Sequence, residues 1–192
     1  MPSAHILAPE LEAFRQEFGR LSAEVEALAG ALSDEQFNWR PAPERWSVAQ
    51  CIEHLNATAR AYQPMLDDGI SEAIRRGLYG SGPFRYSLIG RLFVRSLEPP
   101  AKRRFRAPPP FQPPPERARS QSVPAFKAYQ TQYVDRLRQA NGLDLARARV
   151  RSPVAAWLRL PLGSAFLAML AHERRHLWQA RQVIESPGFP IS

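Results

Sequence analysis

The sequence predicts an all-α protein, a bundle of four helices with one long connection. Four long segments carry apolar residues at spacings of three and four, which is the period of an amphipathic helix. No segment shows the convincing alternation of apolar and polar residues that would indicate a β-strand. The stretch between the second and third of these segments is far longer than a usual helix connection, so we expect a long crossover or a functional lid there.

The first predicted helix lies between Pro9 and Gly30. Pro9 suits the first turn of a helix, and Gly30 suits its end. One face carries a continuous row of apolar side chains: Leu11, Phe14, Phe18, Leu21, Val25 and Leu28. The stretch LSDEQF that follows is expected to form one short helical turn.

The second predicted helix begins within RPAPERWSVAQCIEHL and continues to about Arg76. Ser47 as N-cap and Gln50 three residues later form the pattern of a capping box, in which each side chain bonds the backbone N–H of the other residue. Trp46 precedes the cap, and we expect it to pack against Cys51 as a hydrophobic staple.

The third predicted helix starts near Ser122 and ends before Gly142, which suits a left-handed cap. Its apolar face comprises Phe126, Tyr129, Tyr133, Leu137 and Ala140. The fourth predicted helix runs from about Leu162 to Glu185 and stops before SPG.

The connection between the second and third predicted helices is basic and rich in proline. Its segment 85–119 carries Arg85, Arg91, Arg95, Lys102, Arg103, Arg104, Arg106, Arg117 and Arg119. Together with aromatic residues, this charge could bind phosphate or stack on bases. Because no nucleic-acid motif accompanies it, we expect a connection that packs over one end of the bundle through Phe105 and Phe111, without specific nucleic-acid contact.

Composition narrows the class of protein further. With 192 residues, of which 44% are hydrophobic, the chain can bury one core, so we expect a single domain spanning 1–192. Cys51 is the sole cysteine and excludes an intramolecular disulfide. No signal-peptide pattern opens the sequence, and the apolar run SAFLAMLA is too short to cross a bilayer. A cytoplasmic protein without a membrane partner is therefore expected, although its net charge of +8 permits anionic partners.

The stretch LAHERRHLWQA contains the pattern H-E-x-x-H, which in zinc peptidases provides two metal ligands and a general base. Here these residues are His172, Glu173 and His176. A peptidase needs a third ligand, and the short tail after this helix leaves no room for one on another helix. The metzincin pattern requires glycine and histidine where this chain has Gln179 and Gln182. Neither peptidase pattern is complete.

Any third ligand must therefore come from upstream, where His5 and His54 are the remaining histidines. His5 precedes the first helix and is a poor candidate. His54 shares a helical face with small and apolar residues, as an inward-facing ligand would. With His172 and His176 it would offer three neutral nitrogens to one divalent ion and leave a position open. The alternative is a set of ordinary helical histidines.

The stretches RPAPERWSVAQCIEHLNAT and HERRHLWQARQV together resemble the DinB/YfiT-like superfamily, over roughly residues 39 to 184. The most specific parts are the W-S segment that ends at His54 and the H-x-x-x-H of His172 and His176. The resemblance implies an up-down four-helix bundle, often a homodimer, in which these three histidines bind a divalent metal, commonly zinc or nickel.

The resemblance also implies candidate activities. Characterised members include S-transferases that use bacillithiol or mycothiol and a maleylpyruvate isomerase, and many others are described as metal-dependent hydrolases. We expect a metal-dependent enzyme that activates a low-molecular-weight thiol or water for a small-molecule substrate. A non-catalytic metal- or ligand-binding bundle is the main alternative, followed by an H-E-x-x-H zinc peptidase.

Three further residues are candidates for roles at this site. Glu173 could act as a base, or could instead pair with a neighbouring arginine. Gln179 could hydrogen-bond a metal-bound water, or could be a polar residue at the bundle end. Cys51, one turn before His54, could be a fourth ligand, although lone helical cysteines are usually small buried hydrophobes.

Overall fold

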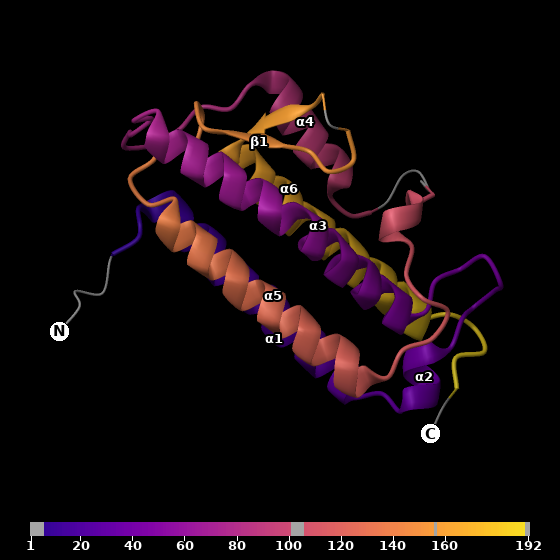
Figure 1. The fold of residues 1–192 in the computed structure, drawn as a ribbon. Helices are drawn as coiled ribbons and strands as arrows, with labels where there is room; N and C mark the ends of the chain where they lie inside the picture. Colours follow the sequence, from indigo (N-terminus) through magenta and orange to yellow (C-terminus); the bar gives the residue numbers. More distant parts are fainter. Residues whose placement is uncertain (1–5, 101–105, 156, 191–192) are drawn as a thin grey trace.

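Four long helices form the body of the protein and lie along one another (Figure 1). They are α1 (Pro9–Gly30), α3 (Val48–Arg75), α5 (Arg119–Gln139) and α6 (Leu162–Ile184). The computed structural model describes residues 6–100, 106–155 and 157–190. Each of the four predicted helices is present, and the four-helix bundle is confirmed.

The helices do not alternate strictly up and down along the chain. Asn56 at the start of α3 donates a hydrogen bond to the backbone of Ser122 at the start of α5, while Asp67 and Arg136 pair further along both helices. Consecutive helices α3 and α5 therefore run parallel. This order is possible because the connection between them, described over residues 76–100 and 106–118, is long enough to return the chain along the bundle.

The crossover contains a helix, α4 (Leu88–Leu97), and a short 3₁₀ turn, η1 (Pro109–Phe111). Within the basic, proline-rich segment, no sequence pattern indicated α4. Ser87 caps it by accepting a hydrogen bond from the Gly90 backbone N–H, and the helix packs along α6. In η1, Phe111 is buried against α3, whereas Phe105 lies outside the described residues.

A small antiparallel hairpin departs from the all-helical expectation. It consists of β1 (Arg149–Arg151) and β2 (Arg159–Pro161). These strands were missed because three residues are too few to show an alternating pattern. The hairpin packs closely on α3 at Gly69, where an added Cβ would lie 2.8 Å from the Arg149 carbonyl oxygen. Glycine at this position is therefore needed for the close approach.

The predicted helix starts agree with the structure at two points. Ser33 and Gln36 form a capping box at α2 (Asp34–Asn38), the short turn expected within LSDEQF. Ser47 and Gln50 form the predicted capping box at α3, with both reciprocal hydrogen bonds at 3.1 Å. This cap fixes where α3 begins and therefore the height of His54 in the bundle.

The core lies between the four long helices. The apolar face predicted for α1 is buried from Leu11 to Val25, and Phe18 of α1 stacks on Tyr133 of α5 with ring centroids 4.9 Å apart. Gly142, after α5, has the left-handed conformation predicted for it, with φ of 86°.

Among the described residues, no helix is long and apolar enough to cross a membrane.

Candidate metal centre

Three histidines from two antiparallel helices meet at one end of the bundle. The Nε2 atom of His172 lies 3.2 Å from Nε2 of His54 on α3 and 3.1 Å from Nε2 of His176, one turn further along α6. One ligand atom of each of the three rings lies within 4.8 Å of the other two. The structure thus brings together the three residues that the sequence singled out.

Hydrogen bonds on the far side of two rings fix which nitrogen faces the cluster. Nδ1 of His54 lies 2.7 Å from the Phe111 carbonyl oxygen, and Nδ1 of His176 lies 3.1 Å from Oε1 of Gln179. Because both partners are oxygen acceptors, each Nδ1 must carry the hydrogen of its neutral ring. Both Nε2 atoms then direct bare lone pairs into the cluster, as metal-binding imidazoles do.

The spacing of the nitrogens fits a single divalent ion. Zinc–nitrogen bonds of about 2.0–2.1 Å place two ligand nitrogens about 3.3 Å apart in a tetrahedral centre and about 2.9 Å apart in an octahedral one. The observed separations of 3.1 and 3.2 Å lie between these values. Three nitrogen ligands would leave at least one position open for a small molecule.

Burial keeps the three imidazoles neutral. Loss of solvent lowers the pKa of His172 to about 3, with a further contribution from His54 and the positive charge of Arg175. The pKa of His176 is lowered well below its usual value for the same main reason. Burial also lowers the pKa of His54, although its bond to the Phe111 carbonyl opposes the shift. Neutral imidazole is the form that binds metal.

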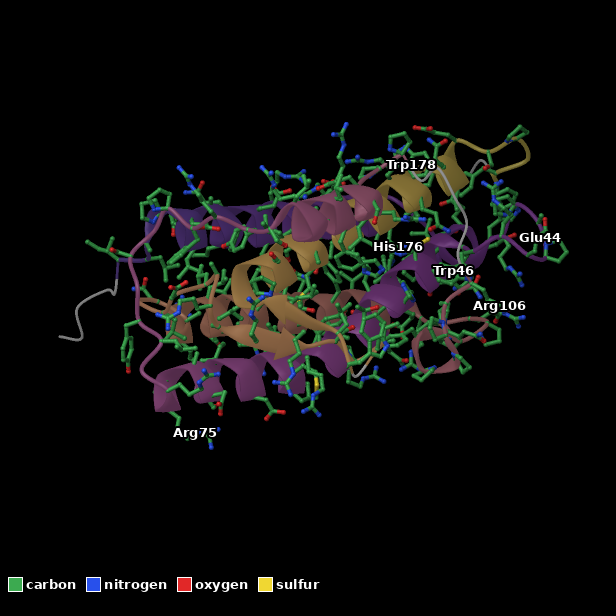
Figure 2. The ribbon with its side chains drawn as sticks, turned by 90° about the horizontal axis from the view of Figure 1, so that it is seen from above. Glu44, Trp46, Arg75, Arg106, His176 and Trp178 are labelled. Atoms are coloured by element: carbon green, nitrogen blue, oxygen red, sulfur yellow. The ribbon has the colours of Figure 1, made fainter. Side chains whose placement is uncertain are left out.

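Trp46 covers one side of the cluster, a role that the sequence analysis missed. Its ring centroid lies 4.9 Å from that of His54 and 5.7 Å from that of His176, and the planes of the Trp46 and His176 rings are inclined by 30°. Figure 2 shows Trp46 beside His176 at one end of the bundle, away from Arg75 at the other. The residue expected to staple Cys51 thus lies against two imidazoles. In the sequence, only the position of Trp46 directly before the α3 cap could have indicated that it lies near His54.

Glu173 faces the interior of the bundle, and its recorded hydrogen bond does not involve the histidines. A step of one residue on a helix turns the side chain by about 100°, and Glu173 accepts a hydrogen bond of 2.9 Å from Gln130 on α5. Burial raises the pKa of Glu173 to about 8, so the carboxyl is protonated at neutral pH. The expected arginine partner is replaced by Gln130. A neutral acid turned toward α5 is unsuited to be a peptidase base.

The surroundings of the other two candidate residues, Gln179 and Cys51, indicate what each side chain contacts. Gln179 binds Nδ1 of His176, on the side away from the cluster, so it orients a candidate ligand. Cys51 is buried in the core, and burial raises the pKa of its thiol. Within the described residues, the grouped ligand atoms come from histidines and include no thiol. His5 lies outside the described residues.

Comparison with solved structures identifies a similar fold. YfiT from Bacillus subtilis, reported as "a probable metal-dependent hydrolase with an unusual four-helix bundle topology", matches with a TM-score of 0.63 and 13% sequence identity. The match covers 99% of this chain and 94% of YfiT. At this identity, the likeness supports the fold alone. Among curated proteins, a sequence search finds no match.

The family comparison covers most of the chain. The sequence model of the DinB superfamily matches residues 17–180, a range that includes all three clustered histidines and all but the outer ends of the four long helices. The bundle agrees with this match, and so does a cluster of histidines that fits a metal ion. The protein is a member of the DinB superfamily.

Proposed function

We propose that this protein is a metal-dependent enzyme in which His54, His172 and His176 hold one zinc or nickel ion and activate a low-molecular-weight thiol. The observation that carries the proposal is the convergence of three neutral imidazoles. Two of them are held with a bare nitrogen toward the cluster by Phe111 and Gln179. The third ring, His172, places its Nε2 within 3.2 Å of both of these nitrogens.

The chemistry that such an ion supplies is that of a Lewis acid, which favours the deprotonated form of a thiol or of water at neutral pH. The chain's own residues set the conditions for it. The histidines contribute no negative charge, so the full charge of a divalent cation would remain available to attract an anionic group. The nearby charge of Arg175 acts in the same direction. Trp46 restricts water at two of the three rings.

Thiol activation is favoured over hydrolysis by the surroundings of the cluster. A hydrolase commonly adds a base that relays the proton of a metal-bound water, and Glu173, the nearest candidate, is bonded to Gln130 on α5 instead. Gln179 is bonded to His176 and cannot act as a base. A thiol has an ordinary pKa of about 8.5, so metal coordination is enough to generate its thiolate. The cytoplasm, where small thiols are kept reduced, is the corresponding proposed location.

Metal content tests the site itself. Protein purified without a nickel column should bind one divalent ion per chain, measured by elemental analysis and by competition with a chromophoric chelator. His54→Ala leaves two nitrogens from one helix and should weaken the affinity by orders of magnitude. Glu173→Gln is the matched control and should keep the metal. An affinity of His54→Ala equal to that of the unchanged protein would exclude the three-histidine site.

Activity assays separate the remaining alternatives. Metal-loaded protein is mixed with a low-molecular-weight thiol and an aryl halide or epoxide, and consumption of both is followed. Metal-dependent consumption of both would support S-transfer. Metal-dependent cleavage of esters or amides in the absence of thiol would instead indicate a hydrolase. Bound metal without either reaction across a broad panel would support a non-catalytic binding bundle.

A further inference from the structure

The β1–β2 hairpin carries a positively charged outer face. Val150 and Leu160 are paired directly opposite each other and buried, whereas the side chains of Arg149, Arg151 and Arg159 are exposed. The register places Arg151 directly opposite Arg159. Like charges in this position destabilise a strand pair. Within the part of the chain that the structure describes, these three arginines have no ion-pair partner. Folding does not explain the arrangement, which suits an anionic partner.

Large apolar side chains are exposed at the turn of the same hairpin. Trp157 is 85% exposed and Val154 is 58% exposed. An indole ring combines a large apolar surface with one N–H donor, so it is most stable where one part is dry and the other is hydrated. This condition exists at the headgroup level of a lipid bilayer.

The outer face of α4 repeats this combination of apolar and basic residues. Leu88 and Leu92 are 62% and 56% exposed, and Arg91 and Arg95 are exposed on the same helical face. The other side of α4 packs on α6. Leucines and arginines side by side on its solvent face offer one partner both an apolar surface and positive charge.

These two outer faces lie on one side of the molecule and form what we call the upper face. Figure 1 places α4 and the hairpin above the bundle, and Figure 2, which looks down on that side, shows them flanking α6. Both are anchored, α4 on α6 and the hairpin on α3 and α6. The arginines and apolar side chains of the upper face are therefore carried by elements that are packed against the bundle.

The chemistry of the upper face selects among possible partners. A second copy of this chain, related by a two-fold axis, would bring arginines against arginines. A nucleic acid could engage the arginines and stack on Trp157, but it would leave Leu88, Leu92 and Val154 in water. An anionic lipid surface offers phosphates to the arginines and an apolar layer to the other side chains. We propose that the upper face attaches the protein peripherally to anionic membranes.

Vesicle binding tests this proposal with the full chain. The protein is sedimented with vesicles of phosphatidylcholine alone or mixed with phosphatidylglycerol. It should bind the anionic vesicles and not the neutral ones, and binding should weaken as sodium chloride is added, because salt screens the attraction. Tryptophan fluorescence should shift to the blue on binding, and Trp157→Ser should remove most of this shift and weaken binding.

Paired charge variants assign the binding to the hairpin. Arg151→Gln with Arg159→Gln should lower the partition coefficient about thirtyfold, since each basic residue near an anionic surface contributes roughly fivefold. Lys127→Gln with Arg138→Gln is the matched control, because it removes the same charge from α5, which Figure 1 shows on the opposite side of the bundle. The control pair should bind nearly as the unchanged protein does.

Several results would overturn the proposal. Equal binding to neutral and anionic vesicles would show that the protein does not recognise lipid charge. Equal losses of binding in the two charge variants would show that binding depends on the net charge of the protein and not on the hairpin. Absence of vesicle binding together with tight binding of a single-stranded oligonucleotide would assign the face to nucleic acid. A dimer in size-exclusion chromatography that only the hairpin variant dissociates would assign it to a second copy.

Discussion

Single side chains decide which nitrogen of each imidazole is available to a metal. Gln179 matters in this way although it lies outside the cluster. By accepting the hydrogen of Nδ1 of His176, it keeps Nε2 unprotonated and limits rotation of the ring. Partners of this kind typically contribute tenfold to a hundredfold to metal affinity.

Gln179→Leu should therefore lower metal affinity about tenfold or more while retaining the fold. Leucine has a similar size but cannot accept the hydrogen bond, so the ring can adopt the other tautomer. The measurement is a competition titration with a chelator of known affinity. Gln182→Leu is a suitable control, because Gln182 bonds Glu185 on the same helix. Equal affinities for the two variants would contradict an orienting role.

The substitution Glu173→Gln should keep both the metal and the stability of the fold. Glutamine retains an oxygen acceptor for Gln130 and adds no charge to a buried position. Glu173→Ala should lower the free energy of unfolding by about 1–3 kcal/mol, because Gln130 then loses its partner. Urea denaturation of the metal-free proteins measures both effects. A large loss for Glu173→Gln would show that the carboxyl is charged and paired in the native state.

The candidate ligands were predictable from the sequence, but their supporting groups were not. His172 and His176 are four residues apart, and because an α-helix has about 3.6 residues per turn, they lie on the same face of α6. Glu173, between them in sequence, is turned toward α5 by the same geometry. The Phe111 carbonyl could not have been foreseen, since every residue has a backbone carbonyl and only the path of the chain brings this one to His54.

At the scale of elements, sequence patterns identified those that are long or well capped. The α1, α3, α5 and α6 helices show several turns of apolar periodicity, and the box of Ser47 and Gln50 marks the start of α3. The shorter α4 is hidden among arginines and prolines, and its burial depends on α6 being present. The three-residue strands carry too little pattern to be identified. Elements that depend on tertiary contacts were the ones missed.

The η1 turn connects the stability of the crossover with the candidate metal centre. Phe111→Ala should lower the free energy of unfolding by about 3 kcal/mol, because a buried aromatic ring is lost. It should also weaken metal binding, because η1 then no longer holds the Phe111 carbonyl oxygen against His54. Phe93→Ala, on α4 in the same crossover, provides the comparison: it should lower stability and leave metal affinity unchanged. If metal affinity were unchanged in both variants, η1 would have no role in metal binding.

Across the whole molecule, the candidate metal centre depends on the directions of the helices. His54 lies early in α3, whereas His172 lies at the middle of α6 and His176 one turn beyond it, and the two helices run antiparallel where these residues meet. Amphipathic periodicity contains no information on direction. The parallel course of α3 and α5 therefore had to come from the structure, although the length of the connection between them made a crossover foreseeable.

A metal held by both α3 and α6 should stabilise the entire fold. Binding to the native state alone adds about 2.7 kcal/mol when free metal exceeds its dissociation constant a hundredfold. For a chain of this size, that corresponds to a rise in melting temperature of roughly 5–10 °C. Thermal denaturation of chelator-treated protein with added zinc or nickel should show this rise, and EDTA should reverse it. Magnesium, which prefers oxygen ligands, should have no effect. Because His54→Ala confines the remaining ligands to α6, its rise should largely disappear. An equal rise in that variant would mean that the metal stabilises the protein from another site.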